Sequence, residues 1–356
     1  MATSRIDRST SAVRSRRLTR RDTLRYGAAA GVALPLLGMG LPRAARAAED
    51  YQIAYLTPGL NVPFWKYLSD GIKQAAATDA AKSGAKITVT DYDSRNSAAT
   101  QLQNAQDVVT AGVDLIIISP TDSSSAPEVL DLAAQNNVPV VIADIGTDSG
   151  DYVSFVISSN ESGAYDSGKV LMQKLADKGW KGSDVMMITI SQARLNGQNR
   201  TKGITRAVEE AGGKIVQFLE SKDYTRAEAQ TQASDMISAN PQAHGFFTQH
   251  DEAALGTYAA IQESGRADDI ILASFDGSPE SVALIKQGKI VAAAMQQPVL
   301  MGRLAMEVGL KHLRGEQVDK QTEVPTILVT PENVKQVEPQ LQDTVFPAQE
   351  ATPTAS

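Results

Sequence analysis

The sequence contains no cysteine among its 356 residues. This absence excludes disulfide bonds, thiolate metal sites, a cysteine nucleophile, and a lipid-anchored export signal, which needs a cysteine at its cleavage point. Histidine occurs only three times. The Gly-x-Ser-x-Gly, His-Glu-x-x-His and Walker signatures of hydrolases, zinc proteases and nucleotide-binding proteins are also missing. The sequence therefore disfavours catalysis, and it predicts no metal site and no cofactor.

Long apolar runs are missing too, because no stretch after Leu41 is long enough to cross a membrane. Residues 1–47 have a different character. They carry ten arginines against two acidic residues, include the pair Arg20-Arg21, and continue into a short apolar run at Gly27–Leu41. Ala45–Ala47 then has the small-x-small pattern of a signal peptidase site. Residues 1–47 thus resemble a twin-arginine export signal cleaved near Ala47, which predicts a periplasmic protein. The alternative is a basic tail that binds nucleic acid.

The charge of the remaining chain disfavours that alternative. The whole chain has a formal net charge of −7, so without its basic leader it carries about −15. An acidic body repels a phosphate backbone, so we expect no nucleic-acid partner.

From residue 51 onward, short apolar strands alternate with amphipathic segments. Leu115–Ile118 is apolar without alternation, as in a strand covered on both faces. We expect strands at 53–56, 87–89, 115–118, 138–142, 153–157, 185–189, 215–218, 245–248, 270–273, 290–295 and 326–329. We expect helices from Pro63, through Leu102–Val109, and at 129–135, 201–210, 226–238, 253–263, 279–287 and 298–314. A helix cap is expected at Ser158–Asn160. The pattern predicts an α/β protein with two Rossmann-like lobes, each built on a parallel sheet.

Acidic residues follow three of these strands. Asp144, Asp251 and Asp276 each stand where an apolar strand stops and a turn begins. Ligands of open α/β sheets collect at the carboxyl ends of the strands. The three carboxyl groups therefore predict a floor of hydrogen-bond acceptors for a small, hydroxyl-rich ligand.

Several short motifs in a fixed order carry a family resemblance. They are Asn61-x-Pro63-Phe64-Trp65, Ser119-Pro120-Thr121-Asp122, Asp144, Gln249-His250-Asp251-x-Ala253-Ala254-Leu255-Gly256, Phe275-Asp276-Gly277 and Gln296-x-Pro298. Over roughly residues 51–330 the chain resembles the type I periplasmic binding proteins of the ribose- and galactose-binding kind, the soluble receptors of ABC importers. The resemblance implies that a multi-stranded hinge joins the lobes near Ser158–Asn160, Gln296-Gln297 and Pro325-Thr326. The predicted lobes are 48–158 plus 297–325 and 159–296 plus 326–332, with a C-terminal tail at 333–356.

The resemblance also implies a set of ligand-binding residues. They are Asn61, Phe64, Trp65, Ser119, Asp144, Gln198, Arg200, Tyr224, His250, Asp276 and Gln296. Phe64, Trp65 and Tyr224 would cover the C–H faces of a sugar ring, and Asp276 would accept from two neighbouring hydroxyls. His250 stands where ribose binders have Asn, and near its reference pKa it could respond to pH. Either Gln198 or Arg200 could reach the cleft.

Four of these residues also have a structural interpretation. Phe64 or Trp65 could pack in the core, Arg200 could be a surface charge, and Asp276 could cap a helix. Ile145 departs from the ribose-binding pattern, which has Arg there. That difference predicts a less cationic pocket, suited to a neutral polyol or a deoxy-sugar as well as to a sugar.

The function that the resemblance implies is capture of a monosaccharide or related small polyol by lobe closure, followed by delivery to an ABC permease in the membrane. We expect the protein to act as a monomer. A sugar-sensing receptor that presents its ligand to a chemoreceptor or sensor kinase remains an alternative. A carbohydrate-acting enzyme and a sugar-responsive repressor are less favoured, since the catalytic signatures and the DNA-binding helix-turn-helix are missing.

Overall fold

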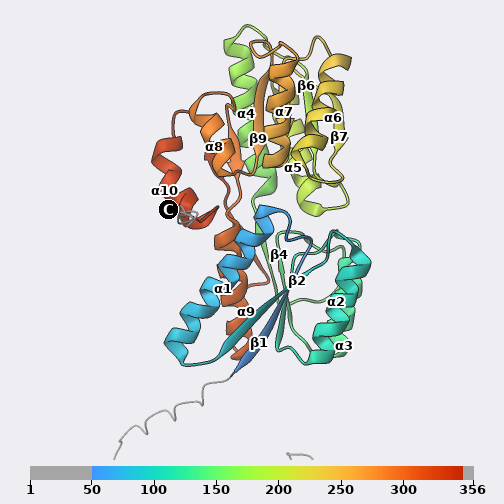
Figure 1. Cartoon of the computed structure of the whole chain (residues 1–356), viewed down its shortest axis with the longest axis vertical. Coiled ribbons are helices and arrows are strands. Elements are labelled where there is room, and N and C mark those ends of the chain that lie inside the picture. The colour runs from blue at the N-terminus through green and yellow to red at the C-terminus, as the bar shows by residue number, and fades with distance from the viewer. Residues whose placement is uncertain (1–49, 348–356) are drawn as a thin grey trace, which may run out of the picture. The chain divides into compact units, whose positions relative to one another are not determined.

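The computed structural model describes residues 50–347, and the statements below refer to these residues. They form two six-stranded sheets with helices on both faces of each (Figure 1). The predicted export signal at 1–47 and residues 348–356 of the predicted tail lie outside the described part of the chain.

The first sheet has the strand order β11-β5-β4-β3-β1-β2, and all its pairings are parallel. Its strands are β1 (Tyr51–Thr57), β2 (Ile87–Asp93), β3 (Leu115–Ile118), β4 (Val140–Ala143), β5 (Ser154–Ser158) and β11 (Gln321–Val324). Its helices are α1 (Pro63–Ser83), α2 (Ala98–Ala111), α3 (Ala126–Gln135) and α9 (Pro298–Leu313). Successive side chains of a strand point to opposite faces. Accordingly, Ile53 and Tyr55 pack with α1 and α9, while Ala54 and Leu56 pack with α2 and α3.

The second sheet repeats this plan with the order β12-β10-β9-β8-β6-β7, in which only the β10–β12 pair is antiparallel. Its strands are β6 (Val185–Thr189), β7 (Ile215–Glu220), β8 (Gly245–Thr248), β9 (Ile271–Phe275), β10 (Ala293–Met295) and β12 (Ile327–Val329). Its helices are α4 (Asn160–Asp177), α5 (Leu195–Glu210), α6 (Arg226–Ala239), α7 (Asp251–Glu263), α8 (Pro279–Lys286) and α10 (Val334–Thr344). Met187 and Phe247 face α4 and α5, and Met186 and Phe246 face α6 and α7.

The chain passes between the two sheets at three places. These are the junctions β5–α4, β10–α9 and β11–β12. All three lie at one edge of each sheet, because β5 and β11 are neighbours in the first sheet and β10 and β12 are neighbours in the second. The α/β architecture with two parallel-dominated sheets is therefore confirmed. The exact lobe boundaries stay a prediction.

Close helix contacts depend on glycine at two facing positions. A Cβ atom on Gly302 of α9 would lie 2.0 Å from the carbonyl oxygen of Leu68, and one on Gly71 of α1 would lie 2.1 Å from that of Val299. Both distances are far below van der Waals contact, so α1 and α9 can approach this closely only without those side chains. This pair of helices supports the strand ends that carry the first-lobe side of the site.

Three of the differences from the sequence-based expectation concern β10, β11 and α10. The strand expected at 290–295 has ladder partners only over Ala293–Met295, although Ile290 is also buried. Strand β11 was missed because its edge position leaves Gln321 and Glu323 exposed, so it has no apolar run. The predicted tail from residue 333 is wrong at its start. Residues 334–344 form α10, and its Val334 and Leu341 lie in the core of the second lobe.

Candidate functional site

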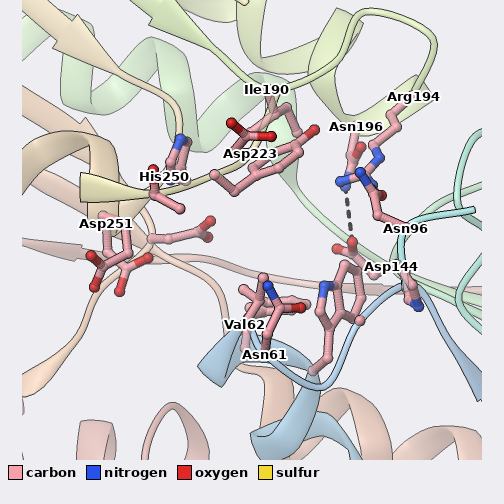
Figure 2. A pocket seen from close by; sticks show the side chains of 18 of the residues that line it. Asn61, Val62, Asn96, Asp144, Ile190, Arg194, Asn196, Asp223, His250 and Asp251 are labelled. Atoms are coloured by element: carbon pink, nitrogen blue, oxygen red, sulfur yellow. Dashed lines mark hydrogen bonds between the residues drawn. The ribbon is translucent and has the colours of Figure 1, made fainter. Parts of the chain in front are cut away.

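A cavity of about 630 Å³ lies among the loops that follow the strands of both sheets (Figure 2). The first lobe lines it with Pro58, Gly59, Asn61, Val62, Phe64, Trp65, Asp93, Arg95, Asn96 and Asp144. The second lobe adds Ile190, Arg194, Asn196, Arg200, Lys222, Asp223, Tyr224, Thr225, His250, Asp251, Glu252 and Asp276, and Gln296 follows β10 at a crossover. The cavity therefore occupies the carboxyl ends of the strands, where ligands of open α/β sheets bind.

The backbone is unusual around this cavity. Six non-glycine residues in the described part of the chain have positive φ angles, and five of them line the cavity. These five are Arg95, Asn96, Asp144, Tyr224 and Asp276, with φ between 50° and 69°. A residue other than glycine pays a free-energy cost in this conformation. Such strain concentrates at functional sites, where the surrounding structure holds side chains in a required direction.

Arg200 and Asp276 form the polar centre of the second-lobe side. Arg200 is 2% exposed, and its Nη1 donates to Asp276 Oδ2 at 3.1 Å and to the carbonyl of Gln249 at 2.6 Å. Its Nε donates to Asn160 Oδ1 at 2.8 Å at the start of α4. Burial raises the pKa of Asp276, and the nearby Arg200 guanidinium opposes this rise. The interpretation of Arg200 as a surface charge is therefore wrong.

Two buried acceptors at the cavity lack a protein donor. Gln296 donates from Nε2 to Asp276 Oδ1 at 2.8 Å, but its Oε1 has no hydrogen-bond partner in the described part of the chain. Asp144 accepts from Asn196 Nδ2 at 2.9 Å on Oδ2, as the dashed line in Figure 2 shows, and its Oδ1 is likewise unpartnered. A buried acceptor without a donor costs free energy, so a donor from another molecule would stabilise the site at these two atoms.

The protonation of Asp144 follows from its surroundings. The side chain is 2% exposed, and burial raises the pKa of its carboxyl group to about 7. Arg200 and Arg194 oppose this rise by their positive charge, whereas Asp276 adds to it. The carboxyl group therefore changes protonation near neutral pH and can either accept or donate a hydrogen bond.

His250 does not behave as the sequence suggested. Burial, together with the charges of Arg200 and Arg194, lowers the pKa of its imidazole to about 3, so it stays neutral at physiological pH. Its Nδ1 accepts from the Ala253 backbone N–H at 3.3 Å, which caps α7. The proton then lies on Nε2, which donates to Ser221 Oγ at 2.9 Å. Both nitrogens have protein partners, so the expectation of pH sensitivity near the reference pKa is wrong.

Aromatic rings border the cavity from both lobes. Phe64 and Trp65 begin α1 and meet edge to face, with ring centroids 4.8 Å apart. Trp65 is 6% exposed and packs in the first-lobe core while it also lines the cavity, so its core role and a ligand role do not exclude each other. From the second lobe, the Tyr224 ring lies under the Arg194 guanidinium at 5.1 Å, and its hydroxyl accepts from the Ser191 backbone N–H.

Nine of the eleven residues predicted to bind ligand line this cavity, and Ser119 and Gln198 do not. Ser119 is fully buried at the end of β3, where its Oγ lies 3.2 Å from the Tyr55 hydroxyl. Gln198 is exposed on α5 and donates to the carbonyl of Gln192. These two predictions are therefore not supported by the geometry.

The expectation of a less cationic pocket also needs correction. Ile145 is fully buried in the first-lobe core, so the departure from Arg at that position does remove a cation. However, Arg95, Arg194 and Lys222 line the cavity in addition to Arg200. The sequence analysis missed these three cations and also Asn196. For Arg95 and Lys222 the signal was their place just after strands β2 and β7, the same kind of position that identified Asp144 and Asp276, whereas Arg194 and Asn196 lie farther from β6, at the start of α5.

The comparisons with known proteins bear on this geometry. The family described as periplasmic binding protein domain matches residues 53–317. The ribose import binding protein of Salmonella typhimurium is 32% identical over 286 residues, which cover 80% of this chain and 92% of that protein. The chain therefore belongs to the periplasmic binding protein family.

Solved structures of such binding proteins share the fold. An ABC transporter solute binding protein from Mycobacterium smegmatis with bound glycerol is 27% identical, with a TM-score of 0.72 and coverage of 81% of this chain and 96% of that chain. A carbohydrate transporter solute binding protein from Agrobacterium radiobacter in complex with D-arabinose has a TM-score of 0.75 at 23% identity, covering 83% and 99%. The fold is thus that of a type I periplasmic binding protein, a family of transport receptors rather than enzymes.

None of the helices in residues 50–347 is both long and apolar enough to span a membrane. Within the same residues, no group of three or more His, Cys, Asp or Glu side chains could hold a metal ion.

Proposed function

We propose that the protein captures a monosaccharide or a related small polyol in the cavity and delivers it to the membrane subunits of an ABC importer. The pair of unpartnered buried acceptors, Asp144 Oδ1 and Gln296 Oε1, carries this proposal. Hydroxyl groups of a sugar are donors of the right kind for both atoms. The two acceptors come from different parts of the fold, after β4 and after β10. A ligand with several hydroxyls could therefore satisfy both at once.

Other groups at the cavity fit the same ligand class. Asp276 already accepts from Arg200 and Gln296, which holds its carboxylate in one orientation for further donors. Trp65 and Tyr224 present rings from opposite lobes, and aromatic rings cover the C–H faces of sugars. The names of the relatives, which mention ribose, glycerol and D-arabinose, agree with a polyhydroxylated ligand. In this proposal Asn61 and Phe64 complete the first-lobe side.

Binding is proposed to close the two lobes over the ligand. The lobes would move as 48–158 plus 297–325 and 159–296 plus 326–332, about the three crossovers at one edge of the sheets. Ligand bound to one lobe completes its hydrogen bonds only when the other lobe arrives, so the ligand favours the closed form by this difference in contacts. The closed, monomeric protein would then dock on the permease, and a chemoreceptor could recognise the same closed surface.

A thermal-shift screen tests this proposal. Purified mature protein is heated with pentoses, hexoses, polyols, inositols and, as a contrasting class, amino acids. A ligand that binds only the folded state raises the melting temperature by mass action. We expect one or more carbohydrates or polyols to raise it, and isothermal titration calorimetry then gives the stoichiometry of one. A shift with amino acids and with no carbohydrate or polyol would show that the ligand class is wrong.

We propose further that residues 1–47 direct export through the twin-arginine route, with cleavage near Ala47. Replacement of Arg20 and Arg21 together by lysine should leave the uncleaved precursor in the cytoplasm, whereas replacement of Arg16 and Arg17 by lysine serves as the control. Fractionation followed by intact mass of the periplasmic protein measures both export and the cleavage point. Normal export of the Arg20/Arg21 variant would assign the signal to another route.

A further inference from the structure

The loop after β6 connects the two lobes on the side of the cavity away from the crossovers. Residues 193–196 belong to the second lobe, and they contact first-lobe residues that follow β2, β3 and β4. The crossovers involve β5 and β11 at one edge of the first sheet, while β3, β1 and β2 lie toward the other edge. In the second sheet, β6 and β7 are likewise farthest from β12. Contacts at 193–196 can therefore hold the lobes together opposite the hinge.

Five hydrogen bonds make up this connection. Arg194 donates from Nε to the Thr121 carbonyl at 2.9 Å and from Nη2 to Asn96 Oδ1 at 3.0 Å. Two further bonds join the backbone of the loop to Ser123, one from the Leu195 N–H to its Oγ and one from its own N–H to the Ala193 carbonyl, both 3.1 Å. Asn196 donates to Asp144 at 2.9 Å. These five hydrogen bonds form between protein groups alone and need no ligand.

Packing and burial reinforce the connection. The Leu195 side chain packs against the first-lobe core, and a Cβ atom on Gly146 would lie 3.0 Å from its Cδ2. Arg194 is 6% exposed and Asn196 is 2% exposed. No carboxylate in the described part of the chain pairs with Arg194, whose guanidinium lies over the Tyr224 ring. Opening of the lobes would return this unpaired cation to water, so the bonds to Thr121 and Asn96 must offset its desolvation in the closed form.

Arg194 also faces the ligand site. Figure 2 shows its side chain at the cavity beside Asn196 and Asn96, and its Nη1 has no hydrogen-bond partner in residues 50–347. One guanidinium therefore contacts the opposite lobe with two nitrogens and keeps the third for a ligand hydroxyl. Asn196 acts on the ligand less directly, because it holds one oxygen of Asp144 and leaves the other for the ligand.

We propose that residues 193–196 form an interlobe latch, in which Arg194 sets how long the ligand is retained and Asn196 positions Asp144. The latch stabilises the closed form by direct contacts between the lobes, so the ligand-free protein already populates the closed form. Ligand retention rests on the proposed sugar-binding function, whereas the ligand-free closure does not.

The ligand-free test uses single-molecule energy transfer. Because the chain has no cysteine, Gln106→Cys in α2 and Glu209→Cys in α5, both exposed, give one label in each lobe. Arg194→Ala should shift the ligand-free distribution toward the open form. Asn96→Asp should shift it toward the closed form, because a carboxylate opposite Arg194 makes a stronger, charge-assisted bond, and Asp tolerates the positive φ at this position. Lys214→Ala, which removes an exposed second-lobe cation whose ion pair with Asp184 stays within that lobe, is the matched control and should leave the distribution unchanged.

The second readout is the dissociation rate of the sugar that gives the largest melting shift, with D-ribose as the first probe. Arg194→Ala should raise this rate about tenfold with a smaller change in the association rate, and Lys214→Ala should leave both within about twofold. The latch is overturned if neither Arg194→Ala nor Asn96→Asp moves the ligand-free distribution. If no sugar binds the parent protein, the proposed function fails, and the ligand-free measurement still decides the latch.

Discussion

The Arg200 guanidinium lies 3.1 Å from Asp276 Oδ2, and both side chains border the cavity from the second lobe, Arg200 from α5 and Asp276 from the turn after β9. The cation is buried and the carboxylate keeps a 14% exposed surface toward the cavity. This asymmetry means that Arg200 is held by protein contacts, whereas Asp276 remains available to a ligand. The pair thus orients one acceptor group.

A change at Asp276 should therefore affect ligand binding strongly. Asp276→Asn keeps the shape but removes the charge, and hydrogen bonds to charged groups contribute about 1.5–3 kcal/mol each. We expect the affinity for the best sugar in the screen to fall at least about 100-fold by calorimetry. Glu280→Gln, an exposed change on α8, is the control and should bind normally. Unaltered affinity in Asp276→Asn would place the ligand elsewhere.

Asp144 should make stability depend on pH. Its folded-state pKa of about 7 exceeds the unfolded value of about 3.9. Between these two values the folded chain keeps a proton that the unfolded chain has released, so the contribution of Asp144 to stability falls as pH rises through this window and is constant above it. Asp144→Asn removes this contribution. The variant's unfolding free energy relative to the parent should therefore increase from pH 4.5 to pH 7.5 in urea titrations.

Asp251 shares this pH window, since burial together with Asp276 and Glu252 raises its pKa to about 7. The difference between variant and parent isolates Asp144 from this second carboxyl group. Asp107→Asn on the exposed surface of α2 serves as the control and should track the parent at every pH. A pH-independent difference for Asp144→Asn would contradict the protonation of its buried carboxyl group.

His250 should contribute to stability as a helix cap. His250→Ala removes the acceptor of the Ala253 N–H and leaves Ser221 without its partner, and loss of a cap costs about 1 kcal/mol. For a domain of this size, that corresponds to a melting temperature lower by about 2–4 °C. Asn is a good cap, so His250→Asn should recover most of the loss in calorimetry. Equal losses in both variants would argue against the capping role.

The two tryptophans should report differently on the ligand. Trp65 lines the cavity, whereas Trp180 stacks on His244 with ring centroids 4.1 Å apart and does not line it. Ligand binding should change the fluorescence of the parent and of Trp180→Phe. Trp65→Phe should lose the change in a titration monitored at the tryptophan emission. A signal that disappears instead in Trp180→Phe would contradict the proposed site.

Much of the fold follows from local apolar patterns. Strands β3, β6 and β8 have the bounds expected from Leu115–Ile118, Val185–Thr189 and Gly245–Thr248, because each is buried on both faces and ends at polar residues. Strand β11 has no such pattern. It pairs only with β5, at an edge, and its place depends on a chain crossover that no local residue pattern specifies.

The site was predictable where chemistry and strand ends coincide, as at Asp144 and Asp276. The site was harder to predict on helices, because side chains two positions apart in a helix point to nearly opposite faces. Arg200 therefore reaches the cavity while Gln198, two residues earlier, lies exposed. Arg194 and Asn196 could not be found in this way, because their contacts depend on how one lobe approaches the other. Ser119 turns into the first lobe, a matter of side-chain direction at the residue that follows β3.

Helix α10 has a practical consequence for protein engineering. Asp343 of α10 accepts a hydrogen bond from Arg303 of α9, and Gln340 of α10 donates one to Gln297, just before α9. Leu341 and Phe346 pack in the second-lobe core. A truncation at residue 333 would remove apolar side chains from the core of that lobe. It would also remove the contacts between α10 and α9. Affinity tags and fluorescent reporters should therefore be attached after Pro347, so that α10 stays intact. There they would follow a helix that contacts both lobes.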